Sequence, residues 1–276
     1  MNQKIHIPKN PILKQIVNFI AYIELDSKIE NYNWIAIFPN GTSNLCISLS
    51  SEKLSFNTDQ EFSMLGASCS SAVALKRNNS LKFLNIQFSP FGMYYFKGIP
   101  MNEIQDKILS CDLLFRASEI ESFRDKLLSS ADLNSKFEAA EDFILSQMQP
   151  NCIDKRVTTA VTLLRNIQNI SMDKLSEIAC LSNRGLTKLF VRQVGLSPNY
   201  FKKLMRFNQA ALSMYNNNEQ SLTRIAAKHD YYDQSHFIKD FKQFARITPT
   251  QFLRDMAKSS DFYNFNLQEL DKLDFS

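Results

Sequence analysis

An internal repeat in the second half of the chain limits the possible folds more than any other feature. A phenylalanine, a hydroxyl residue followed by proline, and a second phenylalanine recur 51 residues further on. The two copies are Phe190, Ser197-Pro198 and Phe201, and then Phe241, Thr248-Pro249 and Phe252. An Ile-Ala pair comes before each copy, at 178–179 and at 225–226, with an offset of 47 residues. We therefore expect two copies of one structural unit, with four more residues between the paired helices of the second.

Hydrophobic spacing within each copy predicts a pair of short helices, because apolar residues three and four positions apart share one helix face. The stronger pattern follows Ser182 and recurs in the stretch Asp230–Phe244. Its apolar positions are Leu186, Leu189 and Phe190 in the first copy, and Phe237, Phe241 and Phe244 in the second. Two short helices joined by a tight turn form a helix-turn-helix. Its second helices are expected at about 183–194 and 234–244.

Residues with side-chain oxygens stand where these helices should begin, and they can accept hydrogen bonds from the free N–H groups of a first turn. The expected caps are Asp154, Ser171, Ser182, Ser197, Asp233 and Thr248. Proline follows Ser197 and Thr248, and it is favoured at the first helical position. Gly195 can end the first copy in a left-handed conformation. The helix that opens at Pro198 is expected to run to about Tyr215 and to join the two units rigidly.

The first half of the chain has a different pattern. Period-two alternation and turn residues predict strands, and the period changes toward helix after Ser89-Pro90. Two strand pairs are expected, Ile35–Ile37 with 45–49 and Ala72–Leu75 with Leu81–Phe88, and helices at 91–96, 102–109, 119–128 and 134–148. Pro150 cannot continue the last helix. The fold class is therefore an α+β domain at 1–150, an all-α domain at 151–258 and an acidic, aromatic tail at 259–276.

The charge distribution favours a polyanion as the partner of the all-α domain. The net charge of the whole chain is +4, but residues 151–258 hold 17 Lys and Arg against 8 Asp and Glu, a balance of +9. A concentration of positive charge in one segment is expected of a nucleic-acid-binding protein. The exposed stripe of the first long helix, Arg184, Thr187, Lys188, Val191 and Arg192, lies opposite its apolar face.

The geometry of two such helices suits double-stranded DNA. A helix with a packed back and a donor-rich front fits the major groove. Two helix-turn-helix units on one rigid connector can place two helices in successive major-groove segments, roughly 34 Å apart. One copy of the chain could then read two half-elements on one face of the DNA.

These motifs resemble those of the AraC/XylS family of bacterial transcriptional regulators over about residues 155–256. The resemblance rests mainly on Ile225-Ala226, Tyr231–Phe244, and Thr248-Pro249 with Phe252, and in the first unit on Leu175, Ile178-Ala179, Leu181-Ser182, Leu189-Phe190 and Gly195–Pro198. It implies seven helices, with two helix-turn-helix subdomains joined by a long helix. Asp230 and Arg246 stand where the family usually has glycine. The first half resembles the N-terminal domain of one subgroup, through Ile37–Gly41, Leu65-Gly66 and Ile86–Pro90 with Gly92.

The resemblance implies roles for the polar residues. Base-reading side chains are expected at Arg184, Thr187, Lys188, Gln234, Ser235, His236 and Lys239. Phosphate contacts are expected from Arg192, Lys202, Lys203, Lys242 and Arg246, which position without specifying. Two further assignments stay open. His236 either contacts a phosphate or caps its helix locally, and Gly185 either allows close approach to DNA or is neutral. Ile238 is placed to touch a thymine methyl group.

Other functional classes find little support. The five cysteines are scattered without a Cys-x-x-Cys pair, which indicates reduced thiols and no metal site. No catalytic constellation, cofactor motif or bilayer-spanning stretch is found, so a non-enzymatic, cytoplasmic protein is expected. Phe91, Tyr94, Tyr95 and Phe96 are expected in the core, although they could line a ligand pocket. Two alternatives remain: a non-specific architectural DNA-binding protein, and a DNA-repair methyltransferase that carries this module.

The expected partners are double-stranded DNA, RNA polymerase, a small-molecule effector at residues 1–150 and a second copy of the chain. Whether the protein activates or represses transcription does not follow from the sequence. The tail at 259–276 holds four acidic residues against one lysine, and it either docks on a neighbouring part of the chain or is a disordered end.

Overall fold

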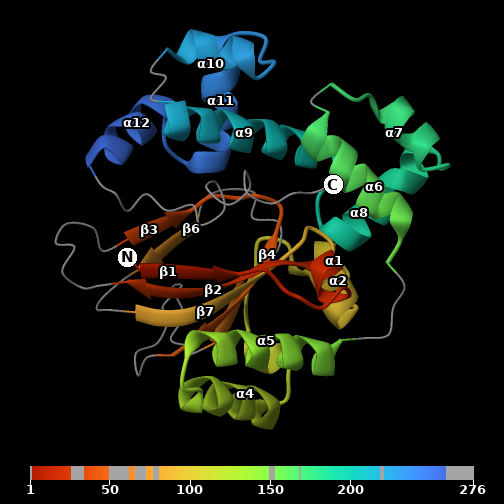
Figure 1. The fold of residues 1–276 in the computed structure, drawn as a ribbon. Helices are drawn as coiled ribbons and strands as arrows, with labels where there is room; N and C mark the ends of the chain where they lie inside the picture. Colours follow the sequence, from red (N-terminus) through yellow and green to blue (C-terminus); the bar gives the residue numbers. More distant parts are fainter. Residues whose placement is uncertain are drawn as a thin grey trace.

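The protein is described here by a computed structural model, which covers residues 2–25, 34–49, 62–65, 73–76, 81–148, 153–167, 169–217 and 221–258. An N-terminal region (residues 2–148) combines an antiparallel sheet with helices, and a C-terminal region (residues 153–258) is helical. The long helix α9 (Pro198–Asn217) crosses above the sheet, and α4 and α5 lie on the opposite side of it (Figure 1). The expected tail at 259–276 lies outside the described residues.

Within the described ranges, the main sheet has the strand order β1-β2-β7-β4-β5-β8, and every neighbouring pair is antiparallel. Its strands are β1 (Asn2–His6), β2 (Val17–Leu25), β4 (Ser43–Ser48), β5 (Phe62–Leu65), β7 (Leu81–Phe88) and β8 (Ile108–Ser110). All of β4 is buried, as is β7 from Phe83 onward, so both faces of the sheet are covered at its centre. Strands that are buried on both faces lose the simple inward-outward alternation.

Helices cover one face of this sheet in two layers. The first layer contains α1, α2 and α5, which pack against one another, and α4 packs on the outer side of α5. The helices of this region are α1 (Leu13–Ile16), α2 (Gly92–Lys97), α3 (Met101–Ile104), the 3-10 turn η1 (Cys111–Leu113), α4 (Ala117–Ser129) and α5 (Leu133–Gln147). Phe91, Tyr95 and Phe96 are buried, as expected for core residues.

The N-terminal region departs from the sequence expectation in three places. The predicted strand pairs do not form hairpins, because β3 (Trp34–Ile37) pairs with β6 (Val73–Lys76) and β4 pairs with β5 and β7. The helix predicted at 102–109 was wrong in its second half, where the chain turns at Asp106 and forms β8. The strands β1, β2 and β5 were not predicted. Each difference concerns pairing between distant segments, which local periodicity does not encode.

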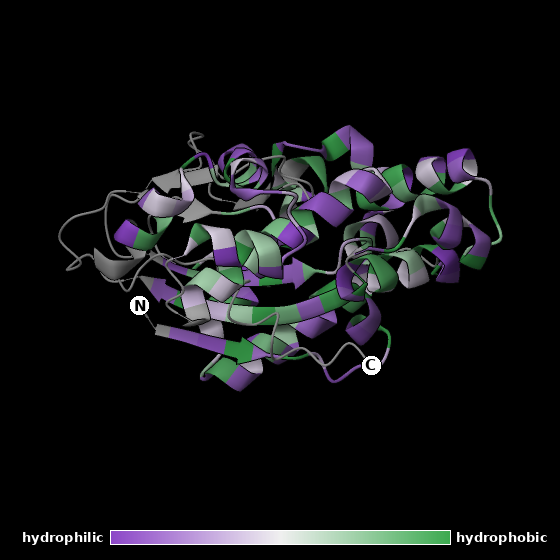
Figure 2. Cartoon of the chain, turned by 90° about the horizontal axis from the view of Figure 1, so that it is seen from above, coloured by the Kyte–Doolittle hydropathy of each residue, from purple (hydrophilic) through white to green (hydrophobic). Residues whose placement is uncertain are grey.

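The C-terminal region consists of two helix pairs at either end of α9. Its helices are α6 (Lys155–Asn166), α7 (Met172–Ile178), α8 (Asn183–Val194), α9, α10 (Leu222–Lys228), α11 (Gln234–Ala245) and α12 (Pro249–Lys258). In Figure 1, α7 and α8 lie at the right-hand end of α9, and α10 and α11 lie toward its other end. The helices carry hydrophilic residues on their outer sides and apolar residues where they meet (Figure 2).

The structure places every expected cap at the start of a helix, which explains why the helices begin where they do. The cap bonds run from Arg156 N to Asp154, Lys174 N to Ser171, Gly185 N to Ser182, Tyr200 N to Ser197, His236 N to Asp233 and Gln251 N to Thr248. Gly195 ends α8 with a φ of 87°, in the left-handed region. The connector α9 runs two residues beyond the expected end at Tyr215.

Gly92, at the start of α2, should tolerate no side chain. A Cβ there would lie 2.0 Å from the carbonyl oxygen of Ile16, which accepts a hydrogen bond from Ser89 N and is therefore held in place. We expect Gly92→Ala to lower the free energy of unfolding by about 3 kcal/mol, measured by urea denaturation. Gly185→Ala is the matched control, because its Cβ would meet side chains alone, Ser182 Oγ at 3.2 Å and Leu181 at 3.9 Å, and the helix would gain propensity. Equal stability of the two variants would contradict this assignment.

Candidate nucleic-acid interface

The outer face of α8 carries polar side chains at its N-terminal end. Arg184, Lys188 and Arg192 are exposed, and Thr187 is half-buried with its hydroxyl donating to the carbonyl of Asn183. The opposite face buries Leu186 and Phe190, and Leu189 is half-buried. Helix α8 therefore has the packed back and open front expected from its spacing.

Helix α11 has the same division. Gln234, Ser235, Lys239 and Lys242 are exposed. Phe237, Phe241 and Phe244 are fully buried. Phe241 and Phe244 form ring contacts with α9 and α12, at centroid distances of 5.1–5.4 Å from Phe207 and Phe252. The aromatic back of α11 thus fixes the helix on its supports and turns the polar side outward.

A buried ion pair fixes the orientation of α11 relative to α9. Arg206 of α9 donates to Asp240 at 2.8 Å, and the Asp240 side chain is only 5% exposed. The same guanidinium donates to the carbonyl of Asp230 at 3.3 Å and lies 4.2 Å from the ring centroid of Tyr231. Sequence reasoning missed this pair. Its signal was a carboxylate, Asp240, among the apolar positions of α11, where an unpaired charge would be costly.

The two positions that depart from the family glycine both adopt the left-handed conformation. Asp230 has a φ of 54° and Arg246 a φ of 61°. Asn169, which precedes α7, donates to the Asp230 carboxylate at 2.9 Å, so the turn before α11 is tied to the first helix pair. These contacts stabilise a backbone conformation that non-glycine residues rarely adopt.

Lys202 and His236, which were expected to contact DNA, are held by partners inside the protein. The Lys202 ammonium group donates to the carbonyl of Ile170 at 2.9 Å, which ties α9 to the segment before α7. The His236 ring packs edge-on against Tyr231, and its Nε2 lies 3.7 Å from Asp240. His236 is therefore placed beside the ion pair of Arg206 and Asp240, and Lys203 is the exposed member of the lysine pair.

The first residues of α8 and α11 occupy equivalent positions, and each side-chain amide bonds to the preceding helix. Asn183 donates to the Asp173 carboxylate at 2.7 Å, and Gln234 accepts from the Thr223 hydroxyl at 3.0 Å. A carboxylate can only accept, so the Asn183 amide nitrogen must face Asp173 and its oxygen is left for an outside partner. Asn183 was not among the expected contact residues, although the 51-residue repeat places it opposite Gln234.

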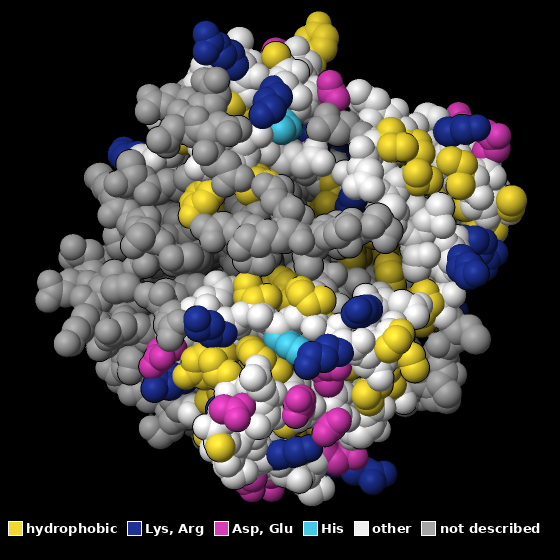
Figure 3. Space-filling view, viewed as in Figure 1, with side chains coloured by type: hydrophobic (Ala, Val, Ile, Leu, Met, Phe, Trp, Pro, Cys, Tyr) yellow, Lys and Arg dark blue, Asp and Glu magenta, His cyan; other side chains and the backbone are white. Residues whose placement is uncertain are grey.

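The charges on the surface separate in the same way as in the sequence. On the face drawn in Figure 3, Asp and Glu side chains gather over α4 and α5 at the bottom of the view, whereas Lys and Arg predominate over the helical upper part. A phosphate backbone would be attracted to the upper part and repelled by the lower part. This distribution agrees with a polyanion site on the C-terminal region.

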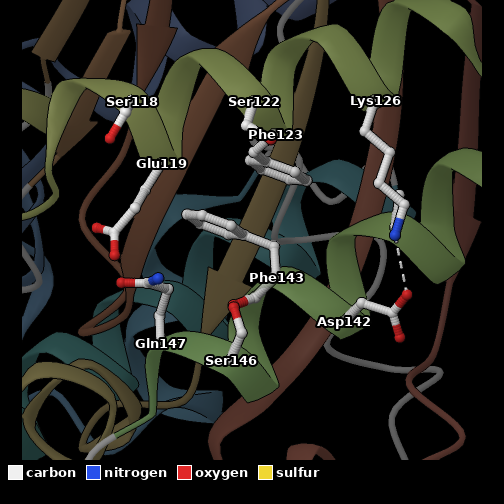
Figure 4. Close-up of a pocket in the computed structure, with 10 residues that line it drawn as sticks. Ser118, Glu119, Ser122, Phe123, Lys126, Asp142, Phe143, Ser146 and Gln147 are labelled. Atoms are coloured by element: carbon white, nitrogen blue, oxygen red, sulfur yellow. Dashed lines mark hydrogen bonds and ion pairs between the residues drawn. The ribbon is translucent and has the colours of Figure 1, made fainter.

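The N-terminal region carries a separate hollow between α4 and α5, with a volume of about 470 Å³. Figure 4 shows the parallel rings of Phe123 and Phe143 at its centre, with centroids 4.0 Å apart, and the ion pair of Lys126 with Asp142 at one end. Hydrogen bonds from the backbone of Arg116 and the side chain of Gln147 lower the pKa of Glu119 at the other end. The hollow is wide open and lies far from α8 and α11, so it is not part of the nucleic-acid interface.

Among the described residues, no three His, Cys, Asp or Glu side chains come together as metal ligands. No helix in the described part of the chain is long and apolar enough to span a bilayer.

Comparison with known proteins finds relatives among transcriptional regulators. Residues 175–255 match a family described as a helix-turn-helix domain. A helix-turn-helix transcriptional regulator of Haemophilus influenzae is 30% identical over 106 residues, which are 38% of this chain and 35% of that protein. An activator of the XylDLEGF operon from Pseudomonas putida is 30% identical over 89 residues, 32% of this chain and 27% of that protein. The chain thus spans only about a third of the length of these curated relatives.

A similar solved structure is ToxT from Vibrio cholerae, with 11% identity, a TM-score of 0.47, and coverage of 85% of this chain and 97% of ToxT. The sequence matches confirm the resemblance inferred from the motifs: the C-terminal segment is similar to the helix-turn-helix domains of transcriptional regulators.

Removal of one partner from the buried pair of Arg206 and Asp240 should destabilise the C-terminal region. Asp240→Ala leaves a guanidinium in a largely buried site without its carboxylate, and we expect a loss of about 3–5 kcal/mol in the free energy of unfolding. The exposed pair of Lys174 and Glu177 provides the control, since Glu177→Ala should cost less than about 1 kcal/mol. Urea denaturation followed by circular dichroism measures both, and similar losses for the two variants would contradict the role given to Asp240.

Proposed function

We propose that this AraC/XylS-type chain is a cytoplasmic, sequence-specific transcriptional regulator that reads two successive major-groove segments with α8 and α11. The observation that carries the proposal is the pairing of two exposed polar helix faces at the two ends of one continuous helix. Helix α9 has 20 residues, a length of about 30 Å. One turn of DNA spans roughly 34 Å. The two helix pairs, as helix-turn-helix units, would therefore reach half-elements one turn apart.

Base reading is assigned to the outer face of the N-terminal half of each helix. In α8 these are Arg184, Thr187 and Lys188, and in α11 they are Gln234, Ser235 and Lys239. Arginine and lysine pair with guanine O6 and N7, and glutamine pairs with adenine. His236 is assigned a supporting role, because its ring lies beside Tyr231 and Asp240.

Phosphate contacts are assigned to exposed cations farther along the same surfaces: Arg192, Lys203, Lys242 and Arg246. Such contacts supply affinity and salt dependence without base preference. Lys202 is assigned to the fold, because its ammonium group holds the Ile170 carbonyl.

The proposal includes three partners besides DNA. One relative is described as an operon transcriptional activator, which favours contact with RNA polymerase. A small-molecule effector at the N-terminal region and a second copy of the chain complete the proposal.

The division between base readers and phosphate contacts can be tested on a duplex selected from a random pool by the full-length protein. Arg184→Ala and Gln234→Ala should each weaken binding to this duplex by about 1–3 kcal/mol and relax the base preference in one half-element. Lys242→Ala, the matched control, should weaken all sequences alike and flatten the dependence on salt. Fluorescence anisotropy measures the affinities. Unchanged preference for both reader variants would sink the assignment, and a selection without any motif would favour an architectural protein.

Asn183 gives a second, narrower test. With its amide nitrogen held by Asp173, its oxygen can accept only from cytosine N4 or adenine N6 in the groove. Asn183→Ala should reduce the preference for one such base in the first half-element by about 1 kcal/mol. Asp173→Ala frees the amide to rotate, so the preference should broaden while binding is retained. Repeated selection with each variant measures the change, and an identical motif for the wild type and Asn183→Ala would refute the contact.

A further inference from the structure

One turn of this protein is buried, although its residues are of the kind usually found in exposed turns. The stretch Phe38-Pro-Asn-Gly41 contains the residues typical of exposed turns, and connecting segments usually run over the surface. Yet each residue from Phe38 to Ser48 is buried. Asn40 Oδ1 accepts from the backbone and the hydroxyl of Thr42, at 3.1 and 2.7 Å, so the turn is internally bonded. Some other part of the molecule must cover it.

The cover is provided by the C-terminal region. Gly41, with a φ of 74°, lies so close to Phe201 of α9 that a Cβ would come within 2.7 Å of its ring. The ring of Phe38 makes edge contacts with Phe207 of α9 at 6.4 Å and with Phe252 of α12 at 5.7 Å. The turn therefore presses against one stripe of α9.

The same stripe of α9 supports both recognition helices. Phe201 packs against Phe190 of α8 at 5.6 Å. Phe207 packs against Phe241 and Phe244 of α11 at 5.2 and 5.1 Å. The turn Phe38–Gly41 thus lies on α9 between the side chains that hold α8 and those that hold α11.

A second contact reaches α8 directly. The Tyr95 hydroxyl of α2 donates to Gln193 at 2.8 Å and accepts from the backbone N–H of Asp154 at 2.5 Å. Burial raises the pKa of Tyr95, so the hydroxyl stays protonated and remains a donor. Helix α3 also packs against α8. The N-terminal region therefore touches α8 directly and reaches α11 through Phe207 and Phe252, which both pack against Phe241.

We propose that the N-terminal region is a brace for the DNA reader, with Phe38 and Tyr95 as positioning residues that set the separation of α8 and α11. The spacing between half-elements that the protein accepts then depends on this brace as well as on α9. This inference rests on the proposed two-element reading.

The N-terminal region leaves the base-reading side chains exposed, and this determines how its contacts should affect DNA binding. Arg184 and Lys188 of α8, and Gln234 and Lys239 of α11, are exposed while the N-terminal region is docked. Docking therefore does not mask these reading side chains. Long helices bend, and each base pair added between half-elements shifts the second by about 3.4 Å and rotates it by about 34°. A brace that limits bending favours one spacing and weakens binding to the others.

The test uses the full-length protein and a series of duplexes that carry the two selected half-elements, with the spacer shortened or lengthened by one and two base pairs. The wild type should prefer one spacing. Phe38→Ala should reduce affinity for that spacing by about tenfold and flatten the spacing profile, while its affinity for a single half-element stays within about twofold of the wild type. Phe38→Leu keeps apolar volume at the site and should restore most of the preference.

Two more variants separate positioning from folding. Phe123→Ala removes a similarly buried ring from α4, away from the C-terminal region. It should lower stability without changing the spacing profile. Tyr95→Phe removes only the hydroxyl contacts to Gln193 and Asp154 and should flatten the profile in part. If Phe38→Ala does not fold, Tyr95→Phe carries the test.

Three outcomes would overturn the brace. An unchanged profile for Phe38→Ala and Tyr95→Phe would show that α9 alone sets the spacing. Tighter binding at all spacings would make the contact inhibitory. If Phe123→Ala flattens the spacing profile as much as Phe38→Ala does, the change in the profile results from lost stability alone. A wild type that binds one half-element as well as two contradicts the proposed function itself, and that result is seen before any variant is compared.

Discussion

The packing of aromatic rings on α9 is the interaction on which the rest of the C-terminal region depends. Phe201 and Phe207 are both buried, and between them they contact α8, α11 and the turn at Phe38. Each buried phenylalanine contributes about 2–3 kcal/mol through removal of its surface from water. Edge-to-face contacts add a geometric preference that aliphatic side chains lack. Because both recognition helices share one aromatic support, a displacement of that support would move both reading faces.

Polar contacts then fix the orientation of the helices, which the apolar contacts alone do not determine. A helix that packs through aromatic rings alone can slide or rotate on its support, whereas the pair of Arg206 and Asp240 permits one orientation of α11. The same arginine holds the carbonyl of Asp230. The desolvation of such a pair offsets much of its attraction, so its value lies in orientation more than in net stability. In a protein that reads DNA, a displacement of a recognition helix by a few ångströms changes the base that its side chains contact.

Sequence predicted those features that depend on neighbours along the chain. The six caps and the apolar stripes of α8 and α11 follow from residues within one or two turns of each other. Asp230 and Arg246 are left-handed at positions where the family resemblance implies glycine. The pairing of β3 with β6 depends on residues almost 40 positions apart and could not be read locally. The burial of Phe38 depends on α9, more than 160 residues away. The sequence Phe-Pro-Asn-Gly predicted a turn, but it could not predict that α9 would bury that turn. Asp240 was visible as a charge at an apolar position, but its partner was not.

The buried turn at Phe38–Gly41 also has a consequence for the time during which the protein is made. The turn leaves the ribosome long before Phe201 and Phe207 are synthesised. At about 5–20 residues per second, its cover arrives roughly ten to thirty seconds later. Throughout that interval the N-terminal region would present the Phe38 ring to water and to other nascent chains. Helices α9 and α12 therefore complete the folding of a segment that is translated much earlier, and a chain that stops before α9 would leave the apolar surface around Phe38 exposed to association.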